Sequence, residues 1–459
     1  MNLVHLYIGV SMKLIKNRHE LIKGDLHKIV IESVEEAFDY VDPYTAIINN
    51  VKPTDRGISV KGINIDISGK IHVVGFGKAS KRMAMAINDI LGDKIEGGIV
   101  ITPNEVGKIG PIILVKGDHP IPGENTVKAS NQLIEYLERV ENNDTLLVLI
   151  SGGGSALFEI PEDGVSLDDI RFITKELMKR GADIYELNVV RKRLSKVKGG
   201  KMLRYISAKN IVSLIISDVV DDKIDTIASG PTAPDETSFL DAYMILKRYG
   251  IWNEVPNRIK TIIEKGIKGE TPDTLKVSDP IFSKVMNVIV ASNEILLEAL
   301  AEKLSKRGFK PMILTSMLEG EAREVGKVLA SIIKSIDRYS KPVAKPVALL
   351  AGGETVVTVR GKGIGGRNQE LCLSLSISLK TIENYLALCM GSDGIDGISP
   401  AAGAIVDGNV FKEAIQMGLN PIEFLENNDS FTFFSKLGRA IFTDYTGTNV
   451  NDIFVAIIV

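Results

Sequence analysis

The chain has 459 residues, of which 44% are hydrophobic and 25% charged, a composition typical of a globular protein and not of a disordered or fibrous one. A single hydrophobic core stops growing at about 250–300 residues, so we expect two domains. The 55 basic and 58 acidic residues leave a net charge of −3, which predicts no nucleic-acid or membrane partner. The longest apolar runs are strand-sized, whereas a membrane-spanning helix needs about 20 apolar residues.

The amino terminus is a poor match to a secretory signal peptide. In MNLVHLYIGVSMKLIK the apolar stretch is short, precedes the basic residues and lacks an A-x-A cleavage site. Met12 begins a more ordinary start, which makes residues 1–11 a candidate start-site extension. Two cysteines, Cys372 and Cys389, are too few for a disulfide framework and are typical of thiols in a reducing compartment. We therefore expect a cytoplasmic protein, and the presence of only three glutamines leans toward a thermophilic source.

Strands and helices alternate along the first half of the chain. Apolar, β-rich runs predict the strands, and apolar residues at helical spacing predict the helices between them. In chain order we predict a strand at 71–75, a helix at 80–91, a strand at 98–102, a helix at 125–140, and strands at 145–151 and 211–217. Strands that are apolar throughout are typical of a parallel sheet covered by helices on both faces.

A segment rich in proline and charge, 232–282, is where we expect the domain change. The alternation then restarts, with β-rich runs at 285–291, 311–315, 347–353, 354–359 and 386–394, helices at 293–307, 320–337 and from about 367, and a final strand, DIFVAIIV. The predicted fold class is α/β, in two α/β domains. We assign residues 1–23 to an extension and the start of the first helix, 24–282 to a Rossmann-like domain with a parallel sheet, and 283–459 to a second domain.

Ligands of parallel α/β sheets bind beyond the carboxyl ends of the strands, so the loops that follow each strand matter most. The first predicted strand is followed by Gly75-Phe76-Gly77-Lys78-Ala79-Ser80. The G-x-G resembles a dinucleotide fingerprint, but Ser80 stands where the third glycine belongs. Lys78 at the start of a helix, beside free backbone N–H groups, predicts an anion site.

A glycine triplet follows the third predicted strand, in Ser151-Gly152-Gly153-Gly154-Ser155. Glycines allow the backbone to approach a ligand closely, and exposed N–H groups can hold phosphate oxygens. The loop is not a Walker A motif, because no Gly-Lys pair in the chain is followed by Ser or Thr. It is not the G-x-S-x-G elbow of a hydrolase either.

Six cations lie within eleven residues of the segment NVVRKRLSKVKGGK: Arg191, Lys192, Arg193, Lys196, Lys198 and Lys201. Some of them are expected to be solvated, but such a density can also neutralise a polyanion such as a triphosphate. The fourth predicted strand is followed by Asp218, Asp221 and Asp222. Carboxylates at a strand end suit Mg²⁺, which binds one or two carboxylates together with phosphate oxygens, although aspartates also cap turns.

Three polar loops of the second half are further candidates. Arg367 lies where the loop GIGGRNQE enters a helix, and its fork suits a carboxylate or a phosphate. Asp393 and Asp396 lie in GSDGIDG after a strand, and TGTNVND precedes the last strand. All five histidines precede residue 120, and only His119 lies in a polar turn. A general base in the second half is therefore expected to be an aspartate.

The chain resembles the glycerate kinases that have an N-terminal Rossmann-like domain and a C-terminal MOFRL domain. The resemblance runs from about residue 24 to the end and rests on six motifs in order, SGGGSAL, VRKRLSKVKGGK, SDVV with IASGPT, GGRNQE, GSDGIDG with AAGA, and TGTNVND. It implies two α/β domains with the active site in the cleft between them, the MOFRL domain spanning about 343–455. It also implies transfer of the γ-phosphoryl group of ATP to D-glycerate, at the 2-hydroxyl, with Mg²⁺.

The resemblance implies that Lys78, Arg367 and Asp393 are the catalytic residues. The chain departs from the family at Arg193, where histidine is frequent, and at Pro400, where aspartate is usual. It also has Asp221 in place of a glycine and Lys223 in place of an aspartate. The candidate metal ligands are therefore Asp218 and Asp222, and the candidate nucleotide-binding residues are Ser151, Gly152, Gly153, Gly154, Ser155 and Lys198.

The alternative is a nicotinamide-dependent hydroxypyruvate reductase, which the G-x-G after the first strand favours. Against it, no acidic residue closes the second strand, which is followed by Pro103 and Asn104. That removes the usual partner of the ribose 2′-hydroxyl. The sequence leaves the oligomeric state open, with a homodimer as one option.

Overall fold

The computed structural model describes residues 13–459, so the candidate extension over residues 1–11 lies outside the described residues. The described chain divides into two compact units. One, the inserted unit, is Pro43–Val290. The other, the split unit, joins residues 13–42 to residues 291–459. The split unit therefore consists of two segments, one that ends at Asp42 and one that starts at Ala291, and the inserted unit lies between them in the sequence.

The inserted unit is built on a seven-stranded sheet of order β10-β9-β8-β4-β5-β7-β6. The five strands from β9 to β7 are parallel, and β6 pairs antiparallel with β7. The strands are β4 (Ile71–Phe76), β5 (Ile95–Thr102), β6 (Gly107–Ile109), β7 (Ile112–Lys116), β8 (Thr145–Ile150), β9 (Asn210–Ile216) and β10 (Val285–Ala291). Phe76 pairs with Ile150, and Ile150 with Ile215, so β4, β8 and β9 end side by side.

Helices and a small second sheet complete the inserted unit. The helices α4 (Ser80–Leu91) and α5 (Glu124–Leu137) each follow a strand of the sheet and bury one apolar side. The three-stranded antiparallel sheet is β1 (Val51–Thr54), β2 (Gly57–Val60) and β3 (Ile63–Asp66), and α3 (Pro43–Asn50) precedes it. The parallel sheet predicted for this half is confirmed.

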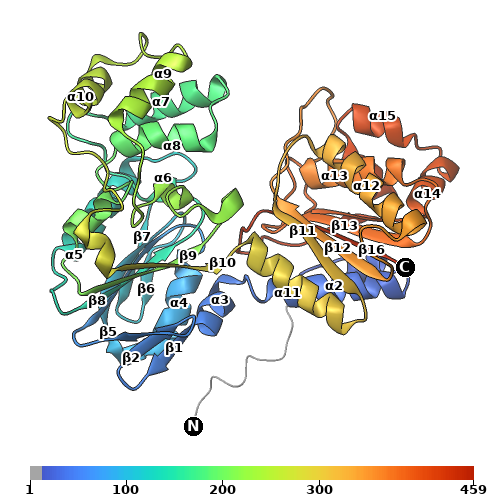
Figure 1. Cartoon of the computed structure of the whole chain (residues 1–459), viewed down its shortest axis with the longest axis horizontal. Helices are drawn as coiled ribbons and strands as arrows, with labels where there is room; N and C mark the ends of the chain where they lie inside the picture. Colours follow the sequence, from blue (N-terminus) through green and yellow to red (C-terminus); the bar gives the residue numbers. More distant parts are fainter. Residues whose placement is uncertain (1–12) are drawn as a thin grey trace. The chain divides into compact units, whose positions relative to one another are not determined.

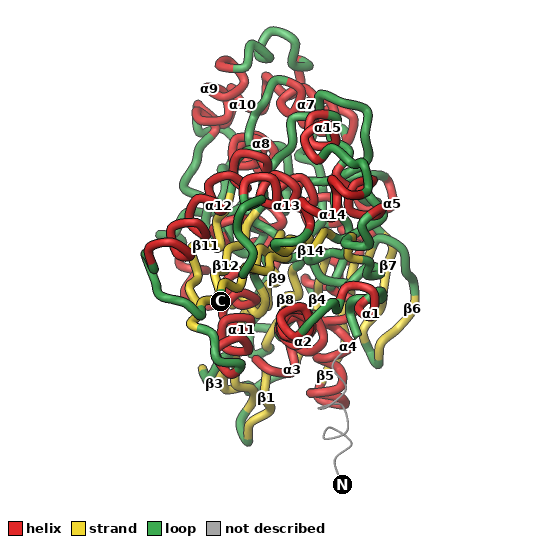
Figure 2. Tube along the Cα trace, turned by 90° about the vertical axis from the view of Figure 1, so that its right-hand side faces the viewer, coloured by secondary structure: helices red, strands yellow, loops and turns green. Residues whose placement is uncertain are grey.

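Four helices form a group with its own core at one end of the inserted unit (Figure 1, Figure 2). They are α7 (Leu167–Lys179), α8 (Ile184–Arg193), α9 (Phe239–Arg248) and α10 (Asn257–Ile267). Side chains such as Ile173, Leu177, Leu246 and Ile259 are fully buried among them. Serine and aspartate capping boxes fix where α7, α8 and α9 begin.

The split unit is built on a six-stranded sheet of order β11-β12-β16-β13-β14-β15. Only β11 and β12 pair in parallel, and the other neighbours are antiparallel. The strands are β11 (Lys310–Leu318), β12 (Val347–Gly353), β13 (Tyr385–Gly391), β14 (Gly403–Asp407), β15 (Ala440–Ile441) and β16 (Asp452–Ile458). Because β16 is antiparallel to both of its neighbours, its first residue, Asp452, pairs with their last residues, Gly353 and Gly391.

Helices cover both faces of this sheet (Figure 1). One face carries α12 (Ala322–Tyr339) and α13 (Arg367–Ser378), and the other carries α2 (Asp25–Phe38) and α11 (Asn293–Lys306). The short helices are α1 (Arg18–Leu21), α14 (Val410–Gln416), α15 (Pro421–Glu426) and α16 (Ser430–Lys436). The core between the sheet and α12 and α13 includes the fully buried Leu349, Cys372 and Leu375.

The structure divides the chain differently from the predicted domains in two places. The helix α2 belongs to the split unit although it comes before the inserted unit, and β10 joins the sheet of the inserted unit although it was predicted to begin the second domain. A third difference is that the run 354–359 forms no strand. Val356 and Val359 are 59% and 74% exposed, and the run makes a single bridge, from Val356 to Glu321. The run therefore has no neighbouring strand to pair with along its length.

Buried charges anchor the amino-terminal segment to the rest of the split unit. Arg439 is fully buried and donates to Asp407 Oδ2 at 2.8 Å and to Glu413 Oε2 at 2.9 Å. Nε2 of His27, on α2, lies 3.1 Å from Asp407 Oδ2. Burial alone would raise the pKa of Asp407, but hydrogen bonds from His27 and Arg439 outweigh it and hold that pKa well below its usual range.

We expect Asp407→Asn to destabilise the protein by about 3 kcal/mol at neutral pH, because it removes one of the two carboxylates that pair with the buried Arg439. A carboxylate with a depressed pKa stabilises the fold above the unfolded pKa of about 3.9 and loses that effect as the pH falls below it. The difference between wild type and variant should therefore be about 1 kcal/mol smaller at pH 3 than at pH 6. Urea unfolding at the two pH values measures it. Asp337→Asn, at the half-exposed pair with Lys345, is the control, and an equal loss at both pH values for Asp407→Asn would contradict the prediction.

Candidate functional site

The loops that follow β4 and β8 lie directly against each other. The backbone N–H of Lys78 donates to the carbonyl of Gly152 at 2.9 Å, and that of Ala79 donates to Ser151 Oγ at 3.1 Å. The Lys78 side chain is exposed, and a Cβ added to Gly153 would lie 3.3 Å from Lys78 Cγ. Gly153 has φ +80, so both its backbone and its surroundings favour glycine. The structure thus brings together Lys78 and the glycine triplet, as predicted from the sequence.

The glycine loop offers backbone donors that the protein itself does not use. Across residues 13–459, no backbone hydrogen bond uses the N–H group of Gly152, Gly153 or Ser155. The side chains of Ser151 and Ser155 differ in accessibility, because Ser151 is buried and Ser155 is half-buried. Free N–H groups on a glycine loop at a strand end are suited to phosphate oxygens.

Of the two candidate metal ligands, Asp218 lies at this loop. A side chain at Gly152 would clash with Asp218 Oδ2, which places the carboxylate beside the glycine triplet. Asp222 follows in a turn with φ +51, and the intervening Asp221 pairs with Lys223 at 3.2 Å. In the described part of the chain, no three His, Cys, Asp or Glu side chains gather into a ready-made metal cage. A bound Mg²⁺ would therefore need ligands from its substrate or from water.

Most of the cations predicted to neutralise a triphosphate are buried and paired with protein groups. Lys198 is fully buried, and its Nζ donates to the carbonyls of Ser155 and Phe158 at 2.8 and 3.0 Å and lies 3.3 Å from Glu159. Burial lowers its pKa to about 8. Lys198 thus stabilises the glycine loop by binding the carbonyl of Ser155. This position differs from the direct contact with the nucleotide that we predicted for Lys198. Three other buried cations pair with carboxylates, Lys192 and Arg193 with Asp235, and Lys201 with Glu162.

His119 lies at the same loop, although the sequence reasoning gave it no role. A Cβ at Gly153 would come within 2.9 Å of the His119 ring, on the side where Lys78 also approaches. Burial first, and then the charge of Lys78, lowers the pKa of His119. The imidazole is therefore neutral at physiological pH and can accept or donate a hydrogen bond there. The only sequence signal for it was its place in a polar turn.

In the split unit, Arg367 begins α13 and is held by two carboxylates. Its Nε and Nη2 donate to the two oxygens of Asp452 at 2.5 and 3.1 Å, and its Nη1 donates to Glu354 at 2.5 Å. The guanidinium has five N–H donors, so two remain for a ligand. Burial raises the pKa of Asp452 to about 7, against the opposing attraction of Arg367.

Asp393 lies next to this pair. A side chain at Gly391 would lie 3.2 Å from Asp393 Oδ1 and 3.5 Å from Asp452 Oδ1, so both carboxylates border Gly391. Asp393 is half-buried, and its Oδ1 accepts from the N–H of Ile395 at 3.1 Å. Asp396, three residues on, is buried and accepts from the backbone N–H groups of Asn368 and Gln369. Asp452 thus contacts Arg367 and borders Gly391 together with Asp393, and both Arg367 and Asp393 were predicted from the sequence.

We expect Arg367→Lys to lower kcat/KM by at least tenfold, because an ammonium cannot reproduce the fork that meets Asp452 and Glu354. Steady-state kinetics together with a thermal unfolding curve separate this loss from a loss of folded protein. Arg323→Lys is the matched control, since Arg323 is also a half-buried arginine whose guanidinium pairs with a glutamate, Glu370. Normal kinetics for Arg367→Lys would show that a point charge suffices.

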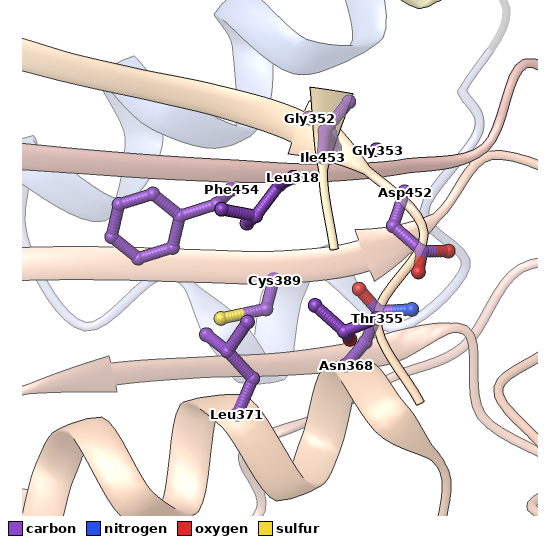
Figure 3. Close-up of a pocket in the computed structure, with 10 residues that line it drawn as sticks. All are labelled: Leu318, Gly352, Gly353, Thr355, Asn368, Leu371, Cys389, Asp452, Ile453 and Phe454. Carbon is purple, nitrogen blue, oxygen red and sulfur yellow. The ribbon is translucent and has the colours of Figure 1, made fainter. Parts of the chain in front are cut away.

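No residue of the glycine loop lines either of two hollows in the described part of the chain. A cavity of about 10 Å³ is lined by Asp452, Asn368 and Thr355 at one end and by apolar side chains such as Phe454 at the other, as Figure 3 shows. Small-molecule pockets measure about 300–1,000 Å³, so this one is too small for a substrate. A larger hollow, of about 330 Å³, includes Asn210 at the amino end of β9, opposite to the end that leads to Asp218.

Two family models match the chain, a domain of unknown function (DUF4147) over residues 29–264 and the MOFRL family over residues 347–452. A glycerate 2-kinase of Pyrococcus horikoshii is 44% identical over 95% of this chain and 98% of its own. A D-glycerate 2-kinase of Thermotoga maritima is 42% identical over 95% of this chain and 99% of its own. A putative hydroxypyruvate reductase of Agrobacterium vitis is 38% identical over 90% of each chain.

The fold is similar to that of a solved structure as well. The crystal structure of a glycerate kinase from Thermotoga maritima matches with a TM-score of 0.84 and 40% identity, over 95% of this chain and 99% of that one. No helix within residues 13–459 combines the length and the apolar character that crossing a membrane requires.

Proposed function

We propose a function on the basis of the family to which this chain belongs, that of the glycerate kinases with a DUF4147 and a MOFRL domain. The chain is an ATP-dependent kinase that phosphorylates D-glycerate at its 2-hydroxyl. The observation that carries this proposal within the structure is the convergence of Lys78, Asp218 and the free N–H groups of the glycine loop at the ends of β4, β8 and β9. Phosphoryl transfer relies on positioning and charge neutralisation more than on covalent chemistry, and these groups supply both.

The glycine loop fits the phosphates of ATP, which supplies the phosphoryl group. The N–H groups of Gly152, Gly153 and Ser155 would hold phosphate oxygens, and Ser151 fixes the loop by accepting from Ala79. Lys78 is exposed beside them and would place its ammonium on oxygens that gain charge in the transition state. Lys198 contributes by holding the carbonyl of Ser155 from beneath.

Asp218 and Asp222 are the residues that we propose for Mg²⁺, which would neutralise phosphate charge when bound. Asp218→Asn is expected to raise the Mg²⁺ concentration that gives half the maximal rate by about tenfold, since an amide is a weaker ligand for a hard cation. Asp222→Asn should shift it in the same direction, and Mg²⁺ titrations of the initial rate measure both. Asp221→Asn is the control, because Asp221 pairs with the surface residue Lys223. An unchanged Mg²⁺ requirement in both variants would place the metal elsewhere.

Arg367 and Asp393 are proposed to act on glycerate. The free N–H donors of Arg367 suit a carboxylate or the transferring phosphate, and the fork is oriented by Asp452 and Glu354. Asp393 would orient the hydroxyl or accept its proton. The described part of this unit has two histidines, of which His19 is exposed and His27 is paired with Asp407. Asp452, the last residue of the candidate loop TGTNVND, was given no role of its own from the sequence, and it would support this role by holding Arg367.

A coupled assay tests the proposal against the alternative reductase. Purified protein should form ADP from ATP and glycerate and should not oxidise NAD(P)H with hydroxypyruvate. The reverse result would favour the reductase named for the Agrobacterium vitis relative. The end of β5 at Thr102 is followed by Pro103 and Asn104, and the next carboxylate, Glu105, is paired with Lys81. No carboxylate directly closes β5 for a ribose 2′-hydroxyl, which also supports the kinase.

We propose in addition a cytoplasmic location and a thermophilic source, on the basis of the sequence features given above. A homodimer stays a prediction, which light scattering on the purified protein tests.

A further inference from the structure

Three side chains form a hydrogen-bonded chain behind the glycine loop. Ser155 Oγ lies 2.8 Å from Ser229 Oγ, and Ser229 Oγ lies 2.9 Å from Asn188 Oδ1. Ser229 and Asn188 are buried, whereas Ser155 is half-buried and is the one member that a ligand can reach. The hydrogen-bonded series of side chains therefore runs from the protein interior to the candidate nucleotide site.

Asn188, at the buried end of this hydrogen-bonded series, determines which group donates in each hydrogen bond. The amide nitrogen of Asn188 points to the carbonyl of Thr226 at 3.5 Å, which leaves its Oδ1 facing Ser229. An amide oxygen can only accept, so the single proton of Ser229 goes to Asn188. Between the two hydroxyls Ser155 must then be the donor. Its proton is committed to Ser229, and Ser155 Oγ presents only lone pairs to the site.

The backbone holds Ser229 in place for this arrangement. Ala228 and Ser229 have φ +51 and +62, in a region that residues other than glycine seldom occupy. A Cβ added to Gly154 would lie 2.7 Å from the Ala228 side chain, so the strained turn packs directly against the glycine loop. Strain of this kind persists where the surrounding structure imposes it and is frequent at functional sites.

We propose that Ser155 is a specificity-determining residue that accepts a hydrogen bond from a hydroxyl group of a ligand, and that Ser229 and Asn188 are positioning residues that fix its polarity. Phosphate and carboxylate oxygens are acceptors and do not pair with a lone pair, whereas a hydroxyl can donate to Ser155 Oγ. The inference depends on the proposed function, in which both substrates carry hydroxyls, ATP on its ribose and glycerate on its second and third carbons.

Four analogues that each lack one hydroxyl identify the donor. They are 2′-deoxy-ATP, 3′-deoxy-ATP, D-lactate and 3-hydroxypropionate, and their dissociation constants are compared with those of ATP and D-glycerate by competition. The wild-type protein should bind one parent compound about tenfold more tightly than its analogue, and Ser155→Ala should abolish that one preference. If Ser155→Ala abolishes the preference for ATP over one of its deoxy analogues, the hydroxyl donor is on the ribose. If it abolishes the preference for D-glycerate over one of the acid analogues, the donor is on glycerate.

Two glycine variants distinguish the effect of the Ser155–Ser229 hydrogen bond from the effect of the strained turn at Ala228 and Ser229. Ser229→Gly removes the group that takes the proton of Ser155, at a φ that glycine adopts without strain, and should lower the same preference at least threefold. Ala228→Gly relieves the same kind of strain and keeps both hydroxyls, so it should leave the preference unchanged. The proposal is overturned if Ser155→Ala keeps all four preferences, or if the two glycine variants change them equally. Phosphoryl transfer by the wild-type protein, measured in the coupled assay, reports separately on the proposed function.

Discussion

Replacing Lys78 by alanine is expected to lower kcat by a factor of about a hundred to a thousand, the size of effect seen when one charge-stabilising donor is removed from an active site. Lys78 is exposed at the start of α4, and its backbone N–H is bound to the carbonyl of Gly152. The alanine variant keeps that backbone bond, so the loops and the fold should be unchanged. If the ammonium acts mainly on charge that develops during transfer, kcat should fall and the Kd of ATP should change much less.

Lys81→Ala is the matched control for this variant. Lys81 lies in the first turn of α4, three residues after Lys78, and pairs with Glu105. The Lys81→Ala variant removes one positive charge from the same region and should leave kcat within a factor of about two, because surface ion pairs contribute little to stability. Circular dichroism and unfolding midpoints show whether both variants are folded. A near-normal kcat for Lys78→Ala would remove this lysine from the mechanism.

Asp393→Asn is expected to abolish turnover and to leave ATP binding nearly intact. The substitution keeps an oxygen that can accept from the N–H of Ile395, so the loop geometry should survive, but an amide cannot take a proton from a hydroxyl. Single-turnover phosphoryl transfer and the Kd of ATP, measured on the same preparation, give the two quantities. Loss of ATP affinity with kcat retained would instead mean that this unit binds the nucleotide.

Asp396→Asn distinguishes catalysis from loop structure. Asp396 is buried and accepts four hydrogen bonds, from the backbone and side-chain nitrogens of Asn368 and Gln369, at the start of α13. Its amide variant should lower the unfolding midpoint, because one of the two oxygens becomes a donor facing donors. If Asp393→Asn gave the same loss of stability with catalysis preserved in the folded fraction, Asp393 would be a turn residue only.

The loops of the inserted unit were predictable from the sequence for a physical reason. In a parallel sheet every strand that runs in one direction ends at the same edge, so residues that follow strands, such as Lys78 and Gly153, can be assigned to one site without knowing the strand order. The pairing of Phe76 with Ile150 and of Ile150 with Ile215 shows that these ends are in register. Periodicity alone was sufficient to locate these elements.

Other parts of the site depend on contacts that periodicity does not encode. Asp452 begins a strand, and only the antiparallel order of β12, β16 and β13 brings it to Arg367. The run of lysines and arginines after Asn188 has the composition of a phosphate site, yet Lys198 and Arg193 are fully buried and paired, because carboxylates distant in sequence, such as Asp235, meet them in the fold. Charge density in a sequence does not show which charges the protein neutralises itself.

The interrupted course of the split unit has a consequence for how the protein is made. Asn17 donates to the carbonyl of Ala440, 423 residues later, so the helices near the amino terminus find their place only when the last part of the chain has left the ribosome. At cellular synthesis rates this delay is roughly tens of seconds. The inserted unit can fold during that time, while the side of α2 that carries Val30, Val34 and Phe38 still waits for its sheet. The nascent chain therefore leaves the apolar residues of α2 without their partner sheet for most of its translation.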